Sequence, residues 1–187
     1  IRFKQLVYLK IMSDSDSDDD NNYMIHGNNI YYYCDVNKKN TLRFNSDIRK
    51  LSNKNSKDIN VYINSDGGEL KCAFSSFDII KSIDNTVNTY CDGTCCSSGT
   101  ILLLAGDNIY MHKNSLLLLH QLSTGFYGKR IDLKDEVFNT DLLYNKMVNI
   151  YQARVKNEDI DIKKELSNEK YMSAHKCLQW KLIDKII

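Results

Sequence analysis

Apolar positions along the chain alternate between two spacings, one typical of amphipathic helices and one of buried strands. Helical spacing predicts helices at 40–52, 70–83, 99–105, 133–155 and 173–180, with Asn40 or Thr41 as the cap of the first. Short runs rich in β-branched and aromatic residues predict strands at 29–33, 59–64, 87–91, 108–111, 115–120 and 183–187.

Strands and helices therefore alternate, which favours an α/β fold with a mostly parallel sheet flanked by helices. Its 187 residues suit a single domain. We expect that domain over 23–187, after an N-terminal arm over 1–22 that contains the acidic run SDSDSDDD at 13–20. Such a run buries no surface and is typical of a solvated arm.

Charge and composition exclude some functions. Lys and Arg number 25 and Asp and Glu 24, a balance that argues against a nucleic-acid partner. No apolar run approaches the roughly 20 residues of a membrane span. The six Cys show neither CxxC pairs nor zinc spacing, so we expect buried, reduced thiols and an intracellular reducing compartment, either cytoplasm or an organelle of plastid or mitochondrial type.

Candidate chemistry lies where the predicted strands end. Ser97 stands in the small-residue segment Gly93-Thr94-Cys95-Cys96-Ser97-Ser98-Gly99, just before an apolar helix. Gly67-Gly68 follows another strand, and His120 ends a third. Because functional groups gather at the carboxyl ends of parallel strands, a nucleophile, an oxyanion cradle and a base would meet there.

Each of these features taken alone has a simpler interpretation. A Ser in a turn of small residues packs there without chemistry, and a lone His at a strand end is more often a core histidine. A carboxylate that orients His120 would have to come from the C-terminal part, where four candidates stand: Glu169, Glu165, Asp161 and Asp184.

In combination, the segments resemble the caseinolytic protease proteolytic subunit family, ClpP. The family patterns Y-I-N-S-P-G-G, G-x-A-A-S-M-G, M-I-H-Q, G-x-x-G, R-F-L-S-A and G-L-V-D are matched, in order, by Tyr62–Gly68, Gly93–Gly99, Leu118–Gln121, Gly125–Gly128, Lys170–Ala174 and Lys181–Asp184. Ordered matches with similar spacing are far more specific than any one motif, and they favour the catalytic interpretation of Ser97 and His120.

The resemblance implies a serine endopeptidase that cleaves unfolded polypeptides inside a ring-shaped chamber. Ser97 would be the nucleophile, His120 the general base and Glu169 the third member, with the backbones of Gly68 and Ser98 as the oxyanion hole. The family fold is a crotonase-like head of repeated ββα units with a protruding handle, here about 125–155. No cofactor or metal is implied.

The resemblance also implies partners. Two seven-membered rings stack into a tetradecamer that serves protein quality control, fed by an AAA+ unfoldase that uses ATP. The family's apolar docking pocket falls on Tyr62, Tyr90 and Tyr110. Three of its other positions, Ser82, Asp92 and His112, are polar here.

Further departures keep other interpretations open. Asp66 replaces the usual Pro, Cys95-Cys96 replace two Ala, and Glu169 stands where the family has Asp. A catalytically impaired ring subunit that pairs with a ClpP-like paralogue is therefore the alternative. A crotonase-type acyl-CoA enzyme is the third hypothesis, and Ser97 with His120 at the family's spacing weighs against it.

Overall fold

The computed structural model describes residues 22–155 and 159–187, so the arm and acidic run expected before Asn22 lie outside the described residues. Its eight strands are β1 (Tyr23–His26), β2 (Asn29–Tyr32), β3 (Ile59–Ser65), β4 (Val87–Cys96), β5 (Asn108–Met111), β6 (Leu116–Leu119), β7 (Lys170–Ser173) and β8 (Lys185–Ile186). Its helices are α2 (Lys38–Lys54), α3 (Leu70–Ser82), α4 (Ser98–Leu104), α5 (Arg130–Val155), α6 (Ile162–Leu166) and α7 (Ala174–Gln179).

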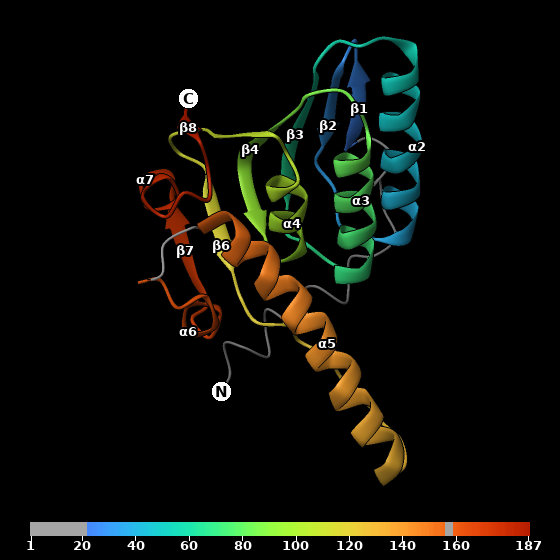
Figure 1. The fold of residues 1–187 in the computed structure, drawn as a ribbon, viewed down its shortest axis with the longest axis vertical. Helices are drawn as coiled ribbons and strands as arrows, with labels where there is room; N and C mark the ends of the chain where they lie inside the picture. Colours follow the sequence, from blue (N-terminus) through green and yellow to red (C-terminus); the bar gives the residue numbers. More distant parts are fainter. Residues whose placement is uncertain (1–21, 156–158) are drawn as a thin grey trace.

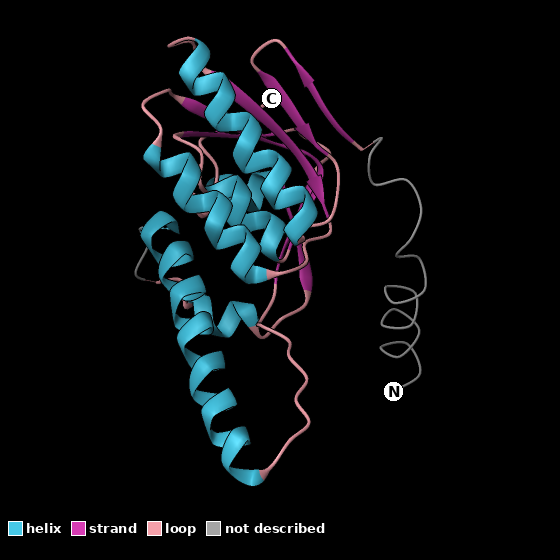
Figure 2. Cartoon of the chain, turned by 90° about the vertical axis from the view of Figure 1, so that its right-hand side faces the viewer, coloured by secondary structure: helices cyan, strands magenta, loops and turns pink. Residues whose placement is uncertain are grey.

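The strands form one sheet in the order β1-β2-β3-β4-β5-β8, with β6 paired to β4 and β7 paired to β6. Strands β2 to β5, β6 beside β4, and β8 beside β5 are parallel, whereas β1 and β7 are antiparallel additions. The expected parallel α/β fold is thus confirmed. Figures 1 and 2 show the helices α2, α3 and α4 on one face of the sheet.

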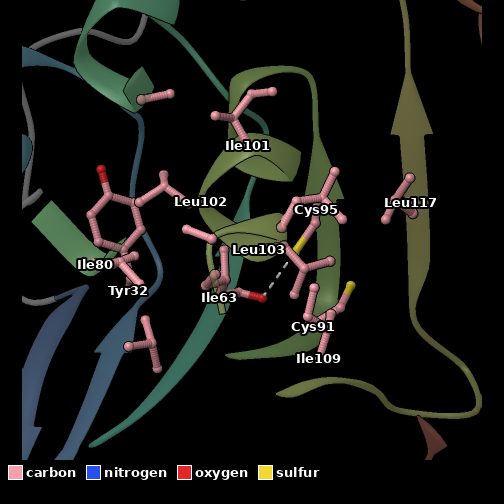
Figure 3. Close-up of a cluster of buried hydrophobic side chains, with 14 of the residues drawn as sticks. Tyr32, Ile63, Ile80, Cys91, Cys95, Ile101, Leu102, Leu103, Ile109 and Leu117 are labelled. Carbon is pink, nitrogen blue, oxygen red and sulfur yellow. Dashed lines mark hydrogen bonds between the residues drawn. The ribbon is translucent and has the colours of Figure 1, made fainter. Parts of the chain in front are cut away.

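The core lies between that face and the helices. Strict alternation along β3 buries Ile59, Val61 and Ile63 completely. Opposite them, α4 is buried along its whole length, which explains why its sequence is uniformly apolar or small. Figure 3 shows Ile63 and Cys95 within this cluster, where the Cys95 thiol lies 3.5 Å from the Ile63 carbonyl oxygen.

Two side-chain rows cross the other face of the sheet, because equivalent positions of the parallel strands lie in register. In one row amide hydrogen bonds of 2.8–3.0 Å join Asn29, Asn60, Asn88 and Asn108 in sequence. In the other row four Tyr rings stack with centroids 4.5–4.9 Å apart: Tyr31, Tyr62, Tyr90 and Tyr110. Both rows are outward-pointing positions of the alternating pattern.

The strand predicted at 87–91 is too short, because β4 continues to Cys96. Its first half pairs with β5 and its last three residues pair with β6. Gly93 has φ +111° at the change of partner, and a side chain there would press on Asn64 at 2.9–3.0 Å. The Asn64 carboxamide oxygen in turn accepts hydrogen bonds from the Thr94 N–H and hydroxyl.

The start of the first helix differs from the prediction, because another side chain caps it. Helix α2 begins at Lys38, and Asn37 rather than Asn40 or Thr41 caps it, since its side chain accepts from the Asn40 N–H at 2.9 Å. The strands β1 and β7 and the short helix α6 were not anticipated. Each of the two strands buries a single residue and therefore shows no apolar alternation, and α6 is only five residues long.

Helix α5 has two distinct halves. Its C-terminal half is buried through Met147, Val148, Tyr151 and Val155. Its N-terminal half projects from the body, as Figure 1 shows. That half leaves five large apolar side chains 45–69% exposed: Ile131, Leu133, Val137, Phe138 and Leu142. None of the described helices is both long and apolar enough to span a membrane.

Candidate active site

Ser97 sits in a strained turn between the end of β4 and the start of α4. Its backbone has φ +51° and ψ −126°, a region that non-glycine residues rarely adopt and that typically costs about 1–3 kcal/mol. The Ser97 N–H donates to the Leu118 carbonyl oxygen at 2.9 Å, and the Ser97 carbonyl accepts from the Thr100 N–H at 3.0 Å. The side chain is half-buried, as an accessible nucleophile requires.

Gly67 lies directly against this turn. A Cβ on Gly67 would come within 2.7 Å of the Ser97 Cβ and 2.8 Å of the Cys96 carbonyl oxygen. The φ of Gly67 is +101°, which a side chain would also disfavour. The first Gly of the pair therefore serves close approach of two backbones.

The two backbone N–H groups expected at an oxyanion hole belong to Gly68 and Ser98. The residues on either side of Gly68 are hydrogen-bonded to Val36. The Val36 N–H donates to the Gly67 carbonyl oxygen at 2.8 Å, and the Glu69 N–H donates to the Val36 carbonyl oxygen at 2.7 Å. Gly68 itself has φ +140°, and a Cβ there would come within 2.3 Å of the Val36 carbonyl oxygen. The Ser98 N–H starts α4, where helical N–H groups have no acceptor within the helix.

Strand register brings His120 to the same end of the sheet. Leu118 pairs with Cys96, the residue before Ser97, and His120 follows it by two residues. In the antiparallel β6–β7 pair, the last registered pair is Leu119 with Lys170. His120 directly follows β6, and Glu169 directly precedes β7.

The other acidic candidates are occupied elsewhere. Asp161 caps α6 through the Lys164 N–H at 3.1 Å, and Glu165 lies 3.9 Å from the Lys176 ammonium. Asp184 accepts from the Ile109 N–H at 2.8 Å and pairs with Arg154. The register therefore favours Glu169 among the four carboxylates as the neighbour of His120.

The cysteines around Ser97 are neutral thiols. All six are buried and free, as the sequence predicted. Burial, and then the Asp66 carboxylate, raise the pKa of Cys96 to about 11, while burial raises the pKa of Cys95 well above its usual range. Since only the thiolate is a strong nucleophile, neither sulfur competes with Ser97 at neutral pH.

The three Tyr expected at a docking surface lie together in the stacked row described above. The polar departures nearby are satisfied within the chain. Asp92 accepts a hydrogen bond from Tyr33 and lies 3.5 Å from His112 Nε2, and the Ser82 hydroxyl donates to the Ile79 carbonyl at 2.8 Å. Asp92 therefore has partners within the chain.

Sequence reasoning missed two hydroxyls next to the nucleophile. The Thr100 hydroxyl donates to the Ser97 carbonyl at 2.6 Å and contacts the Tyr151 hydroxyl at 2.6 Å. Tyr151 lies within the helix predicted at 133–155, and no local signal ties it to Thr100, 51 positions earlier. Within the described residues, no group of three or more His, Cys, Asp or Glu could hold a metal ion.

The family model described as Clp protease matches residues 12–187. Among solved structures, the chain is similar to a mutant of ClpP1 from Listeria monocytogenes with a TM-score of 0.76. The two share 19% sequence identity over 83% of this chain and 88% of that one. The ClpP-like α/β fold expected from the motifs is thus confirmed.

Gly67→Ala should destabilise the protein far more than Gly27→Ala. Both glycines have positive φ, but only Gly67 is crowded, since nothing lies within 4 Å of a Cβ at Gly27. We expect about 1 kcal/mol of lost unfolding free energy at Gly27 and several kcal/mol at Gly67, as for overpacking added to backbone strain. Urea unfolding measures both. Equal losses would show that the contact with Ser97 is unimportant.

Proposed function

This chain belongs to the Clp protease family, and we propose on that premise that it is an active serine endopeptidase subunit that cleaves unfolded polypeptides. Ser97 is the nucleophile, His120 the general base and Glu169 the group that orients the imidazole. The N–H groups of Gly68 and Ser98 form the oxyanion hole. The reaction needs no cofactor or metal.

Peptide cleavage then follows from these positions. His120 takes the proton from Ser97 Oγ while the oxygen attacks the scissile carbonyl carbon, and the two N–H groups stabilise the negative oxygen of the tetrahedral intermediate. Collapse of that intermediate breaks the C–N bond, and His120 gives the proton to the leaving amine. Water, activated by the same imidazole, hydrolyses the acyl-enzyme.

One observation carries this proposal, namely the strained backbone of Ser97. Nothing in the packing requires a non-glycine residue at φ +51°, and a Gly would relieve the strain. Strain of this kind persists where the side chain is needed in a fixed direction. Here it coincides with an accessible hydroxyl, a neighbouring Gly in contact and a His at the end of the adjacent strand.

Assembly follows the family. We propose heptameric rings that stack through the exposed apolar half of α5, and an AAA+ unfoldase that docks on the tyrosine row at Tyr62, Tyr90 and Tyr110. Exposed side chains such as Phe138, at 69%, carry the ring contact. Met147 faces the core of its own chain, so a charge there would disturb folding rather than stacking.

A second candidate function is a catalytically impaired ring subunit beside an active paralogue. Asp66 favours it, because this exposed carboxylate directly precedes Gly67-Gly68 and repels a developing oxyanion. The retained serine and histidine favour activity. Labelling of the nucleophile separates the two functions.

Wild-type protein should react with a fluorophosphonate probe at Ser97, and Ser97→Ala should not. The mutant should also lose peptide cleavage while keeping its assembled mass, because the hydroxyl is small and half-buried. In-gel fluorescence after labelling, with light scattering on the same samples, measures both. An assembled wild-type protein that fails to label would support the impaired subunit.

Glu169→Gln should lower turnover by about 10⁴-fold, as for other triads whose acid becomes an amide. Glu165→Gln is the matched control, because its carboxylate faces Lys176 instead. Steady-state hydrolysis of a fluorogenic peptide compares the two. An unchanged rate in Glu169→Gln would remove this residue from the triad.

Phe138→Asp should split a double ring into single rings, since it places a charge in the exposed apolar half of α5. Asn139→Asp adds the same charge at the neighbouring exposed position and should leave the mass unchanged. Multi-angle light scattering reports the mass of each variant. A double ring that survives Phe138→Asp would assign the ring contact to another surface.

A further inference from the structure

A buried chain of hydroxyls ends on the carbonyl of Ser97. That oxygen accepts from the Thr100 N–H at 3.0 Å and from the Thr100 hydroxyl at 2.6 Å. The Thr100 hydroxyl is itself 2.6 Å from the Tyr151 hydroxyl. Both side chains are completely buried, and Tyr151 comes from the base of α5.

The donors in this chain can be assigned. A carbonyl oxygen only accepts, so the single proton of the Thr100 hydroxyl lies on the bond to Ser97. The Tyr151 hydroxyl must then donate to the Thr100 oxygen. Burial raises the pKa of Tyr151 to about 12, so this proton stays in place at neutral pH.

The carbonyl of Ser97 and the N–H of Ser98 belong to one peptide group. That group is planar and trans, so the two bonds point in opposite directions and rotate together. Two hydrogen bonds that hold the Ser97 oxygen therefore also hold the direction of the Ser98 N–H. Hydrogen bonds accepted by a carbonyl also polarise the attached N–H and strengthen it as a donor.

We propose that Thr100 and Tyr151 are positioning residues, which aim and polarise the Ser98 N–H toward the oxyanion of the substrate. This inference rests on the proposed function, in which that N–H is an oxyanion donor. It assigns a role to the hydroxyls themselves. Packing alone would be served equally by Val at 100 and Phe at 151, which have nearly the same shape.

The surroundings explain why such an anchor is needed. Ser97 has a strained backbone, and the turn preceding α4 contacts Gly67 rather than a side chain that could restrain it. Without the Thr100 hydroxyl, the Ser97 carbonyl oxygen would keep only the hydrogen bond from the Thr100 N–H, which closes a tight turn. A small rotation of this plane relieves strain at Ser97 and moves the N–H away from the oxyanion.

The test compares Thr100→Val, Thr100→Ser and Tyr151→Phe with the wild-type protein, with Ser97→Ala as the inactive control. Turnover and KM are measured with a casein substrate carrying a self-quenched fluorophore, and the second-order rate of fluorophosphonate labelling is measured beside them. Circular dichroism and light scattering check that each variant is folded and assembled.

Thr100→Val should lower kcat about tenfold with KM within about twofold, a part of the 10²–10³-fold loss typical when an oxyanion donor is removed. Labelling should slow in parallel, because the phosphonyl oxygen occupies the same hole. Thr100→Ser should restore both rates to within about twofold. Tyr151→Phe should lower kcat about threefold, since the bond to Ser97 remains and loses only its polarising partner.

Wild-type kcat in a folded Thr100→Val variant, or an equal loss in Thr100→Ser, would overturn the inference while leaving the proposed function intact. If Thr100→Val does not fold, Tyr151→Phe tests the inference instead. A lower kcat with an unchanged KM would support it, and a wild-type kcat would overturn it. Failure of the wild-type protein itself to label or cleave would overturn both the proposed function and this inference.

Discussion

The change of partner within β4 is the constraint on which the site depends. Strand β4 pairs with β5 up to Cys91 and with β6 from Thr94 onward. Gly93, at φ +111°, makes the bend, Asn64 holds Thr94, and the Ser115 hydroxyl donates to the Cys91 carbonyl while accepting from the Gly93 N–H. Without this bend, β6 would not lie beside Cys96, and Ser97 would have no Leu118 carbonyl to bond.

From this bend the site assembles by register. Pairing with β6 places His120 past the same end of the sheet as Ser97, and β7, which pairs with β6, begins directly after Glu169. The β3–β4 pair supplies the second side, since Ser65 lies in register with Cys95 and Gly67 contacts Ser97. Four strands, β3, β4, β6 and β7, thus contribute to a candidate site of a few residues, which makes its geometry sensitive to any slip in pairing.

The two faces of the sheet have different physical roles. The covered face is apolar and close-packed against α3 and α4, so it supplies the stability that offsets strain at Ser97. The other face carries the asparagine row, whose amides are hydrogen-bonded along the row, and the tyrosine row, whose rings stack. A surface of this kind stays satisfied before any partner arrives, and this suits the proposed docking role of the tyrosine row.

Sequence periods predicted most of the helices and strands, because β-branched alternation and helical spacing are local properties. Ordered motifs were specific enough to predict the family and to single out Ser97, Gly68 and His120. The path of β4 was mispredicted, since Gly93 resembles a turn when its new partner, 23 residues later, is not considered. Short elements such as β7 carried too little pattern, although β7 decides where Glu169 lies.

What the sequence determined by itself is the alternation of elements, the buried thiols and the identity of the residues that can carry the chemistry, because these follow from side-chain type and spacing. Only the tertiary structure decided how closely Gly67 approaches Ser97, and that Tyr151 reaches Thr100. These depend on strand register and on helix packing between residues far apart in the chain, and no local pattern encodes those distances.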